Sequence, residues 1–315
     1  MLLEKNDYEH AANKTDMITG HIKELRGVLK YNEPMADHTS WRAGGSADHY
    51  FEPADLEDLI TYLKSVPADK QLLWVGLGSN LLVRDGGFRG SVIALNRAFN
   101  NLEINTSGQI KVDAGVPCAK VARCSAREGY TGAEFLAGIP GTMGGALAMN
   151  AGAFGGETWN IVTRVRTLSR SGMTNIRLPA DFNIGYRSVQ IPGDEWFISA
   201  ELQLQKDHEK IVGQRIRDLL EKRSATQPTG LPSCGSVFRN PTGDYAARLI
   251  DACGLKGKRI GNASISEKHA NFIINHGNAT ASDIERLISF AQQSVQEQFG
   301  VELIPEVRIV GESKD

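Results

Sequence analysis

Glycine-rich segments are the feature of this sequence with the clearest chemical use. Three lie in its first half: SWRAGGSAD (40–48), GLGSN (76–80) and IPGTMGGALAMNAGAFGGE (139–157). Glycine tolerates positive φ and lets a ligand approach the main chain, and successive N–H groups in such turns can bind an anion. A glycine-rich loop as long as the third is uncommon in a compact domain without a function. We therefore expect a pyrophosphate-bearing cofactor held by main-chain atoms.

The segment GLGSN follows an apolar run, QLLWV (71–75), as the first loop of a Rossmann domain would. The GxGxxG fingerprint is not met, because Leu81 occupies its last position, and no helical pattern follows. Taken alone, the segment is either an ordinary turn or a ligand loop, with Ser79 and Asn80 as side-chain donors. The Rossmann interpretation is excluded.

Three short polar motifs supply groups that could act on a bound ligand: GYRSV (185–189), CGSVFRNP (234–241) and PEVR (305–308). They offer a guanidinium whose fork matches a carboxylate, a hydroxyl and a carboxyl group. On composition alone, however, the same residues are a surface cation, a turn serine and a solvated glutamate.

The overall composition excludes several classes of protein. Thirty-five Lys and Arg against thirty-seven Asp and Glu give a net charge of −2, which provides no basic face for nucleic acid. There is no run of about 18 apolar residues for a membrane span, and the first residues lack a signal-peptide pattern. The four cysteines form no CxxC pair and have no histidine at zinc spacing, so we expect no metal site and cysteines that pack as small hydrophobes in a reducing cytosol.

The length of 315 residues favours two domains or three small ones. Apolar spacing predicts helices at 53–66, 117–129, 209–226, 245–254 and 282–300. The last of these is expected to begin with a Ser282–Glu285 capping box and to end at Gly300. Strands are expected at 71–75, 91–95, 101–115, 163–172, 175–181, 195–205, 269–275 and 302–311, whereas 132–157 shows no sustained period. We predict a loose N-terminal arm over 1–30, a main boundary near 205 and a weaker one near 95.

Seven motifs, in order over residues 37–311, resemble the flavin-dependent UDP-N-acetylenolpyruvoylglucosamine reductases of bacterial peptidoglycan synthesis. They are HTSWRAGGSAD, VGLGSNLLVRDGGFRG, EFLAGIPGTMGGALAMNAGAFGGE, GYRSV, CGSVFRNP, KHANFIIN and PEVRIVG. The resemblance implies an α+β fold with a PCMH-type FAD-binding module at 31–205 (subdomains 31–95 and 96–205) and a substrate-binding domain at 206–311. No tyrosine-bearing insertion lies between Leu204 and Ser236, which is similar to the shorter subtype of the family.

The resemblance also implies roles for single residues. FAD would be held by the GSN turn and the IPGT stretch, with the first glycine pair in support: Gly44, Gly45, Gly76, Gly78, Ser79, Asn80, Ile139, Pro140, Gly141 and Thr142. The catalytic residues would be Arg187, Ser236 as proton donor and Glu306. Substrate contacts are expected from Lys222, Gln227, Arg239, Asn240, Asn271 and Arg308. Arg239 stands where many members carry lysine, and the two cations differ in geometry.

The implied reaction is NADPH- and FAD-dependent reduction of the enolpyruvyl group of UDP-N-acetylglucosamine enolpyruvate, in the cytoplasm and with UDP-sugar and NADPH as small-molecule partners. Glu306 would be either protonated or bridged to Arg308, since burial raises a carboxyl pKa and a neighbouring arginine lowers it. Two alternatives stay open: a PCMH-type flavin oxidase with another substrate, and a nucleotide-binding regulatory module without catalysis. The sequence does not give the oligomeric state.

Overall fold

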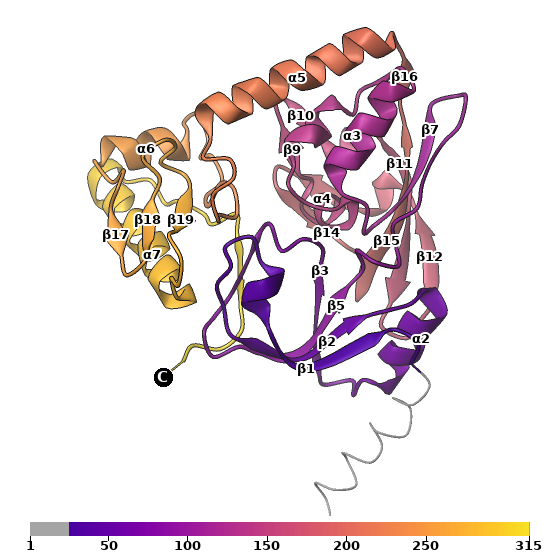
Figure 1. Cartoon of the computed structure of the whole chain (residues 1–315), viewed down its shortest axis with the longest axis horizontal. Coiled ribbons are helices and arrows are strands. Elements are labelled where there is room, and N and C mark those ends of the chain that lie inside the picture. Colours follow the sequence, from indigo (N-terminus) through magenta and orange to yellow (C-terminus); the bar gives the residue numbers. More distant parts are fainter. Residues whose placement is uncertain (1–24, 315) are drawn as a thin grey trace, which may run out of the picture.

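The computed structural model describes residues 25–314, which form three regions around a central junction (Figure 1). The helices are α2 (Leu56–Ser65), α3 (Cys118–Arg127), α4 (Met143–Met149), α5 (Glu209–Thr226), α6 (Ala246–Ala252) and α7 (Ala281–Phe299). The principal strands are β1 (Val28–Pro34), β2 (Ser46–Glu52), β3 (Gln71–Val75), β4 (Leu81–Val83), β5 (Phe88–Ala94), β6 (Leu102–Ile104), β7 (Gln109–Asp113), β11 (Val162–Ser169), β12 (Thr174–Arg177), β13 (Asn183–Gly185), β14 (Ser188–Gln190), β15 (Glu195–Gln203), β17 (Arg259–Ile260), β18 (Ala263–Ile265), β19 (Ile273–Asn275) and β20 (Arg308–Val310). Two-residue strands and 3₁₀ segments, among them η2 (Glu134–Gly138), complete the fold.

The first region is a four-stranded sheet in the order β1-β2-β5-β3. Strands β2, β5 and β3 run parallel, and α2 is the crossover segment that precedes β3. Asp55 caps α2 by accepting a hydrogen bond from the backbone N–H of Asp58, and Leu59, Tyr62 and Leu63 are buried. The mixed pattern of parallel and antiparallel strands agrees with the predicted α+β class.

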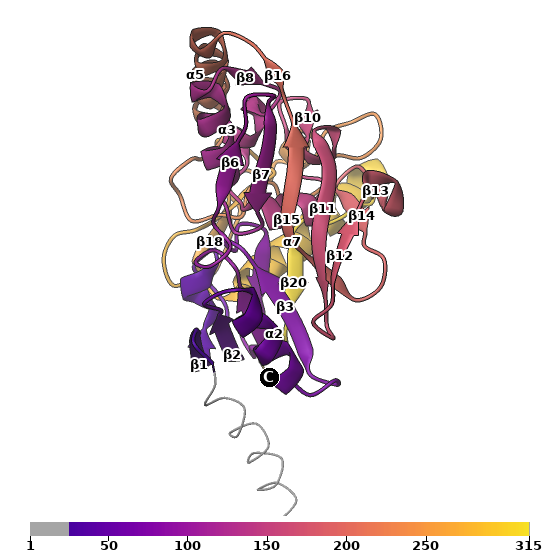
Figure 2. The ribbon, with the colours of Figure 1, turned by 90° about the vertical axis from the view of Figure 1, so that its right-hand side faces the viewer.

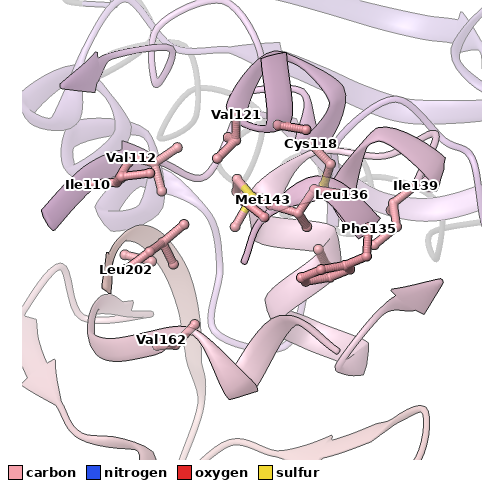
Figure 3. Packing of buried hydrophobic residues seen from close by; sticks show 14 of the residues in the cluster. Ile110, Val112, Cys118, Val121, Phe135, Leu136, Ile139, Met143, Val162 and Leu202 are labelled. Carbon is pink, nitrogen blue, oxygen red and sulfur yellow. The ribbon is translucent and has the colours of Figure 1, made fainter. Parts of the chain in front are cut away.

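The second region is an antiparallel sheet in the order β12-β11-β15-β7-β6, whose strands lie side by side in Figure 2. Its largest core lies between this sheet and α3, η2 and α4, where Ile110, Val112 and Leu202 meet Val121, Leu136 and Met143 (Figure 3). Val212 and Ile216 of α5 belong to the same core, so this long helix packs on α3 and η2.

The third region packs α6 and α7 on the small antiparallel sheet β17-β18-β19. Thr280 caps α7, with Asp283 completing a capping box, and Gly300 ends the helix at φ 68°. The predicted Ser282–Glu285 box is therefore wrong. The backbone N–H of Ser282 instead donates to Asp85 at 2.8 Å, and Glu285 pairs with Arg84 at 2.8 Å.

Contacts between distant parts of the chain join the third region to the first. Trp41 is fully buried in the core of the third region, and its indole N–H donates to the backbone oxygen of Ile273 at 2.7 Å. Strand β20, near the C-terminus, pairs in parallel with β4. These contacts fix the C-terminal third of the chain against the first glycine-rich loops.

Several expected elements differ from the structure in extent. Residues 1–24 of the predicted arm lie outside the described residues, but 25–30 are not loose: Arg26 and Gly27 bond to Asp58, and β1 begins at Val28. A short helix, α4, forms within 132–157, where none was expected. The strand expected at 269–275 covers only Ile273–Asn275, and that at 302–311 only Arg308–Val310.

Helices 117–129, 209–226 and 245–254 form close to their predicted positions, and Gly129 follows α3 with φ 68°. Of the four free cysteines, Cys118 and Cys234 are buried and the other two half-buried. No helix of residues 25–314 combines the length and apolarity that a membrane crossing requires.

Candidate active site

A cavity of about 300 Å³ lies where the three regions meet. Its lining comes from six of the seven motifs, all except HTSWRAGGSAD (38–48), and from the end of α5: Ser79 and Asn80, Gly138–Pro140, Met149 and 151–154, Tyr186 and Arg187, Arg223 and Gln227, Cys234–Ser236, Phe238 and Asn240, Asn271 and Phe272, and Glu306. Arg187, Ser236 and Glu306, which are far apart in sequence, are thus brought to one cavity. Among the described residues that line the cavity, Glu306 is the only acidic one.

Arg187 occupies the turn between β13 and β14 with φ 52°, an unusual backbone conformation for a residue with a side chain. Its guanidinium donates to the backbone oxygen of Gly152 at 2.6 Å. Its Nε lies 3.4 Å from Oε1 of Glu306, an ionic contact whose geometry is not that of a hydrogen bond. The buried Nε therefore has no acceptor among the described residues.

Glu306 is positioned through its main chain. Its N–H donates to the backbone oxygen of Val237 at 2.7 Å, which places it next to the segment that carries Ser236. Its backbone oxygen accepts a hydrogen bond from Nδ2 of Asn80 at 3.0 Å. One residue thus touches both the serine segment and the predicted flavin loop.

Burial raises the pKa of Glu306 above its ordinary value, and the nearby guanidinium groups of Arg187 and Arg239 only partly oppose that increase. The carboxyl group consequently stays protonated to a higher pH than an exposed glutamate. Its cationic neighbour is Arg187 rather than Arg308, so the expected bridge to Arg308 is not formed. Arg308 is exposed and does not line the cavity.

Ser236 follows Gly235, which has φ 73° and lines the same cavity. The flanking Val237 is fixed on both sides: its N–H donates to the backbone oxygen of Asn271, and its own oxygen accepts from Glu306. Within residues 25–314, the hydroxyl of Ser236 has no hydrogen-bond partner of its own. It is available to a ligand.

The two predicted flavin loops lie in direct contact. A Cβ at Gly76 would come within 2.3 Å of Oγ1 of Thr142, and one at Gly141 within 3.2 Å of Oγ of Ser79. Gly78 has φ 59°, and a Cβ there would lie 2.0 Å from the backbone oxygen of His38. Larger residues would force these loops apart, which explains why glycine is needed at these positions.

The remaining predicted cofactor residues divide into two groups. Ser79, Asn80, Ile139 and Pro140 line the cavity. Gly44 and Gly45 do not line it and instead pack against the main chain of Val83 and Asp85, where a Cβ would come within 2.6 and 2.4 Å of backbone oxygens. Gly44 and Gly45 therefore allow their segment to pack closely against Val83 and Asp85.

The predicted substrate residues are distributed unevenly. Gln227, Asn240 and Asn271 line the cavity, whereas the exposed Lys222 does not. Both ends of the Asn271 amide are bonded to the main chain of Phe238, at 3.0 and 2.8 Å, and Oδ1 of Asn240 accepts from the N–H of Ala246 at 3.1 Å. Arg239 lies close enough to lower the pKa of Glu306, and its buried Nε has no partner in the described structure.

Arg223 is a cavity residue that the sequence analysis missed. It lies near the end of α5, next to Lys222, and its Nε donates to the side chain of Gln227 at 3.2 Å. The one sequence signal that could have identified it is the helical period of α5, which determines whether Lys222 or Arg223 faces the rest of the fold. Burial lowers its pKa, as expected for a cation placed away from water.

These residues fit a bound flavin dinucleotide. The cavity lining contains two arginines, Arg187 and Arg223, against one carboxyl group whose pKa is raised, and the buried Nε of Arg187 has no acceptor in the described structure. An anionic ligand would supply the missing acceptor. The close contact of the two glycine-rich loops leaves main-chain atoms and the hydroxyl of Ser79 along one wall.

Comparisons with known proteins find matches for two parts of the chain. Residues 47–175 match the model of an FAD binding domain, and residues 227–310 match the C-terminal domain of UDP-N-acetylenolpyruvoylglucosamine reductase. The crystal structure of UDP-N-acetylenolpyruvylglucosamine reductase (MurB) from Thermus caldophilus superposes with a TM-score of 0.78 at 32% identity. The match covers 90% of this chain and 99% of that one.

Curated relatives are more similar still. The UDP-N-acetylenolpyruvoylglucosamine reductase of Methylococcus capsulatus is 55% identical over 92% of this chain and 95% of its own length. That of Thiobacillus denitrificans is 49% identical over 97% and 99%, respectively. The resemblance inferred from the seven motifs is confirmed, and with it the α+β fold that combines a PCMH-type FAD-binding module with a C-terminal domain. The chain belongs to the UDP-N-acetylenolpyruvoylglucosamine reductase family.

Proposed function

We propose that this protein is an FAD-containing UDP-N-acetylmuramate dehydrogenase that uses NADPH to reduce the enolpyruvyl group of UDP-N-acetylglucosamine enolpyruvate. The observation that carries the proposal is the meeting of Arg187, Ser236 and Glu306 at one cavity with the loop residues Ser79 and Pro140. Family membership supplies the substrate class. Bound FAD would supply the hydride that reduces the terminal vinyl carbon.

Arg187 is suited to bind and polarise the substrate carboxylate. Hydride addition to the vinyl carbon places negative charge on the adjacent carbon and on the carboxylate conjugated with it. A guanidinium held by the backbone oxygen of Gly152, with a buried Nε that has no acceptor, is pre-oriented for that charge.

Ser236 is suited to donate the proton that completes the reduction. An alcohol is a weak acid, but a carbanion centre next to a carboxylate is basic enough to take its proton, and the serine would regain one from water. The serine hydroxyl has no competing partner in the described structure, and hydrogen bonds on both sides of Val237 hold its segment in place.

Glu306 complements this arrangement in its protonated form. Its raised pKa allows the carboxyl group to lie beside developing negative charge as a hydrogen-bond donor instead of repelling it. Two main-chain hydrogen bonds, to Val237 and from Asn80, fix its position.

The proposed reaction also suggests where the enzyme acts and which part of the chain binds each ligand. We propose that the enzyme acts in the cytoplasm, where UDP-linked precursors and NADPH are used, at a step of peptidoglycan synthesis on which cell-wall biogenesis, cell shape and the division cycle depend. We propose that 31–205 holds FAD, in subdomains that meet near 95, and that 206–311 binds the UDP-sugar. The core shared by α5 and the second sheet implies that the start of the latter unit is anchored on the former.

Anaerobic stopped-flow of the two half-reactions tests the proposal. The purified protein should be yellow and should bleach with NADPH, and addition of UDP-N-acetylglucosamine enolpyruvate should restore the colour. Ser236→Ala should slow the second step by about 10²–10⁴ and leave the first nearly unchanged, as expected for loss of a general acid. Ser289→Ala, an exposed change on α7, is the control.

The outcomes separate the alternatives. An equal fall in both half-reactions of Ser236→Ala would refute the proton-donor role. Rapid colour recovery in air without the UDP-sugar would favour a flavin oxidase, and a colourless protein that takes up no flavin would favour a regulatory module.

A further inference from the structure

Asn150 ends the short helix α4 in a left-handed conformation, with φ 47° and ψ 53°. It is buried and does not line the candidate active site, although its neighbours Met149 and Ala151 do. The residue therefore lies beside the reaction cavity without facing a ligand. Glycine adopts this backbone conformation at a helix end even more readily than asparagine, so the conformation alone does not explain the side chain.

The carboxamide of Asn150 is fully used within the protein. Its Nδ2 donates to the backbone oxygen of Gly185 at 3.2 Å and to Oε2 of Glu157 at 2.9 Å. Its Oδ1 accepts from the backbone N–H of Trp159 at 3.2 Å. The backbone oxygen of Gly185 can only accept and the N–H of Trp159 can only donate, so these two partners fix the orientation of the amide.

Two contacts of Asn150 converge on Arg187. Gly185 pairs with Ser188 to close the turn between β13 and β14, so the bond from the amide holds the strand end that leads into this turn. The backbone oxygen of Asn150 accepts from Nη1 of Arg187 at 3.4 Å, beside the shorter bond from Nη2 to Gly152. One buried residue thus contacts both the turn and the guanidinium that the turn presents.

The turn between β13 and β14 needs support from outside the hairpin. Its two strands have three residues each and form a two-stranded sheet of their own, which has little stability by itself. Arg187 also has φ 52°, which a residue with a side chain adopts only at an energetic cost. Helix α4 lies against β14, and Asn150 at its end supplies two of the contacts that oppose relaxation of the turn.

The other side of Asn150 is fixed to the core of the second region. Trp159, whose N–H bonds to Oδ1, is buried in that core, and its indole N–H donates to the backbone oxygen of Leu147 at 2.9 Å. The hydroxyl of Thr158 donates to the backbone oxygen of Ala151 at 2.7 Å. The amide therefore connects the turn to a rigid part of the fold.

We propose that Asn150 is the positioning residue for Arg187 in the reduction. Its amide holds the turn and its backbone oxygen holds the guanidinium, so that the fork of Arg187 meets the substrate carboxylate in one orientation. The inference rests on the proposed function, because the orientation of Arg187 matters only if this residue binds the charge that develops on the substrate.

The test is anaerobic stopped-flow of both half-reactions on Asn150→Gly and Asn150→Asp. The glycine variant keeps the left-handed helix end and the backbone oxygen but lacks the amide, and the aspartate variant keeps the shape but cannot donate to Gly185 when ionised. Each should slow flavin oxidation at saturating UDP-sugar by about 10- to 100-fold, because a misplacement of about 1 Å can cost about 10² in rate. Flavin reduction by NADPH should stay within threefold of wild type.

Asn183→Ala is the matched control. It removes an exposed amide from the far end of the same hairpin, where the side chain bonds only to that of Gln190 at 3.2 Å among the described residues. Neither half-reaction should change by more than threefold in this variant. A loss as large as that of Asn150→Gly would show that any weakening of the hairpin has the same effect, and the specific role of Asn150 would be wrong.

A double-mutant cycle with Arg187→Ala separates positioning from general support of the fold. If Asn150 acts through Arg187, Asn150→Gly should slow flavin oxidation of the Arg187→Ala enzyme by less than threefold, because no guanidinium is left to orient. Losses that multiply in the double variant would mean that the two residues act independently, which would overturn the proposal.

The remaining outcomes are equally decisive. Oxidation within threefold of wild type in both Asn150 variants would show that Arg187 is oriented without the amide. Equal slowing of both half-reactions, or failure of both variants to fold or to hold flavin, would assign the amide to the fold and also overturn the proposal. A wild-type protein whose reduced flavin is not reoxidised by the UDP-sugar would instead refute the proposed function, whatever the Asn150 variants did.

Discussion

Asn80 offers a sharp test of how the predicted flavin loop and the segment that carries Glu306 act together. Its Nδ2 donates to the backbone oxygen of Glu306 at 3.0 Å and contacts Sδ of Met149 at 3.5 Å, at the end of α4. Its own backbone oxygen accepts from the N–H of Arg308 at 3.1 Å. Asn80→Ala removes the first two contacts and keeps the third, so it loosens Glu306 without unpairing the strand.

The expected loss of stability is modest. One neutral amide-to-carbonyl bond contributes about 1 kcal/mol net, and an oxygen left without a partner adds about as much again. A total of about 1–2 kcal/mol corresponds, for a chain of this length, to a melting temperature lower by roughly 1.5–3 °C. The kinetic loss should be larger, because a misplacement of about 1 Å at a reacting group can cost about 10² in rate.

Stopped-flow at saturating FAD should thus show a 10- to 100-fold slower oxidation by the UDP-sugar, with flavin reduction by NADPH within threefold of wild type. Asn80→Asp sharpens the test, because an ionised carboxylate repels the oxygen of Glu306 where the amide attracted it, and it should be worse than Ala. Asn100→Ala, an exposed asparagine outside the cavity, controls for general effects. Equal slowing of both half-reactions would mean that Asn80 serves the cofactor alone, and an unchanged second step would refute the coupling.

Two further predictions concern the carboxyl group and the buried indole. The oxidative half-reaction should slow as pH rises through the raised pKa of Glu306, where the native protein holds a proton that the unfolded chain has lost. Stability should decline over the same range, and both dependences should disappear in Glu306→Gln but persist in the control Glu302→Gln; a pH profile unchanged in Glu306→Gln would contradict this. Trp41→Ala should lower the free energy of unfolding in urea by about 3–5 kcal/mol, because it opens a cavity and leaves the oxygen of Ile273 unpaired; a loss below about 1 kcal/mol would show that the indole is not central to the junction.

The sequence predicted helices and strands well where apolar residues recurred at a regular spacing and clear signals marked both ends of the element. The helix over 209–226 forms as expected, although only Val212 and Ile216 of its apolar residues are buried in the core and Ile211 and Leu220 are exposed. Helix α4 was missed because glycines and alanines give no polar face. A Cβ at Gly144 would lie 2.9 Å from Cβ of Ala114, so close packing rather than helix propensity explains the sequence of α4. The cap of α7 was misassigned because Ser282 and Glu285 are used by Asp85 and Arg84, partners that only the tertiary structure supplies.

The candidate site shows the same limit, because the sequence identified several of its residues but not which side chains would be their neighbours. Motifs identified Arg187, Ser236 and Glu306, and all three reach one cavity, but their chemical roles stay predictions. The choice between Arg187 and Arg308 as the neighbour of Glu306 could not be made from sequence, because the turn between β13 and β14 reaches the cavity only in the folded chain. Adjacent Lys222 and Arg223 differ for a similar reason: the orientation of α5 on its neighbours turns only one of them inward.

The burial of Trp41 within the third region has a consequence for how such a chain can evolve. An indole contributed by the first region completes the core of the third, and β20 returns to pair with β4. Neither the first nor the third region can be replaced by that of a relative unless the contact surfaces match. Recombination between relatives should therefore succeed only when both regions are inherited together. Although the chain carries two separable family signatures, it should melt in a single cooperative transition.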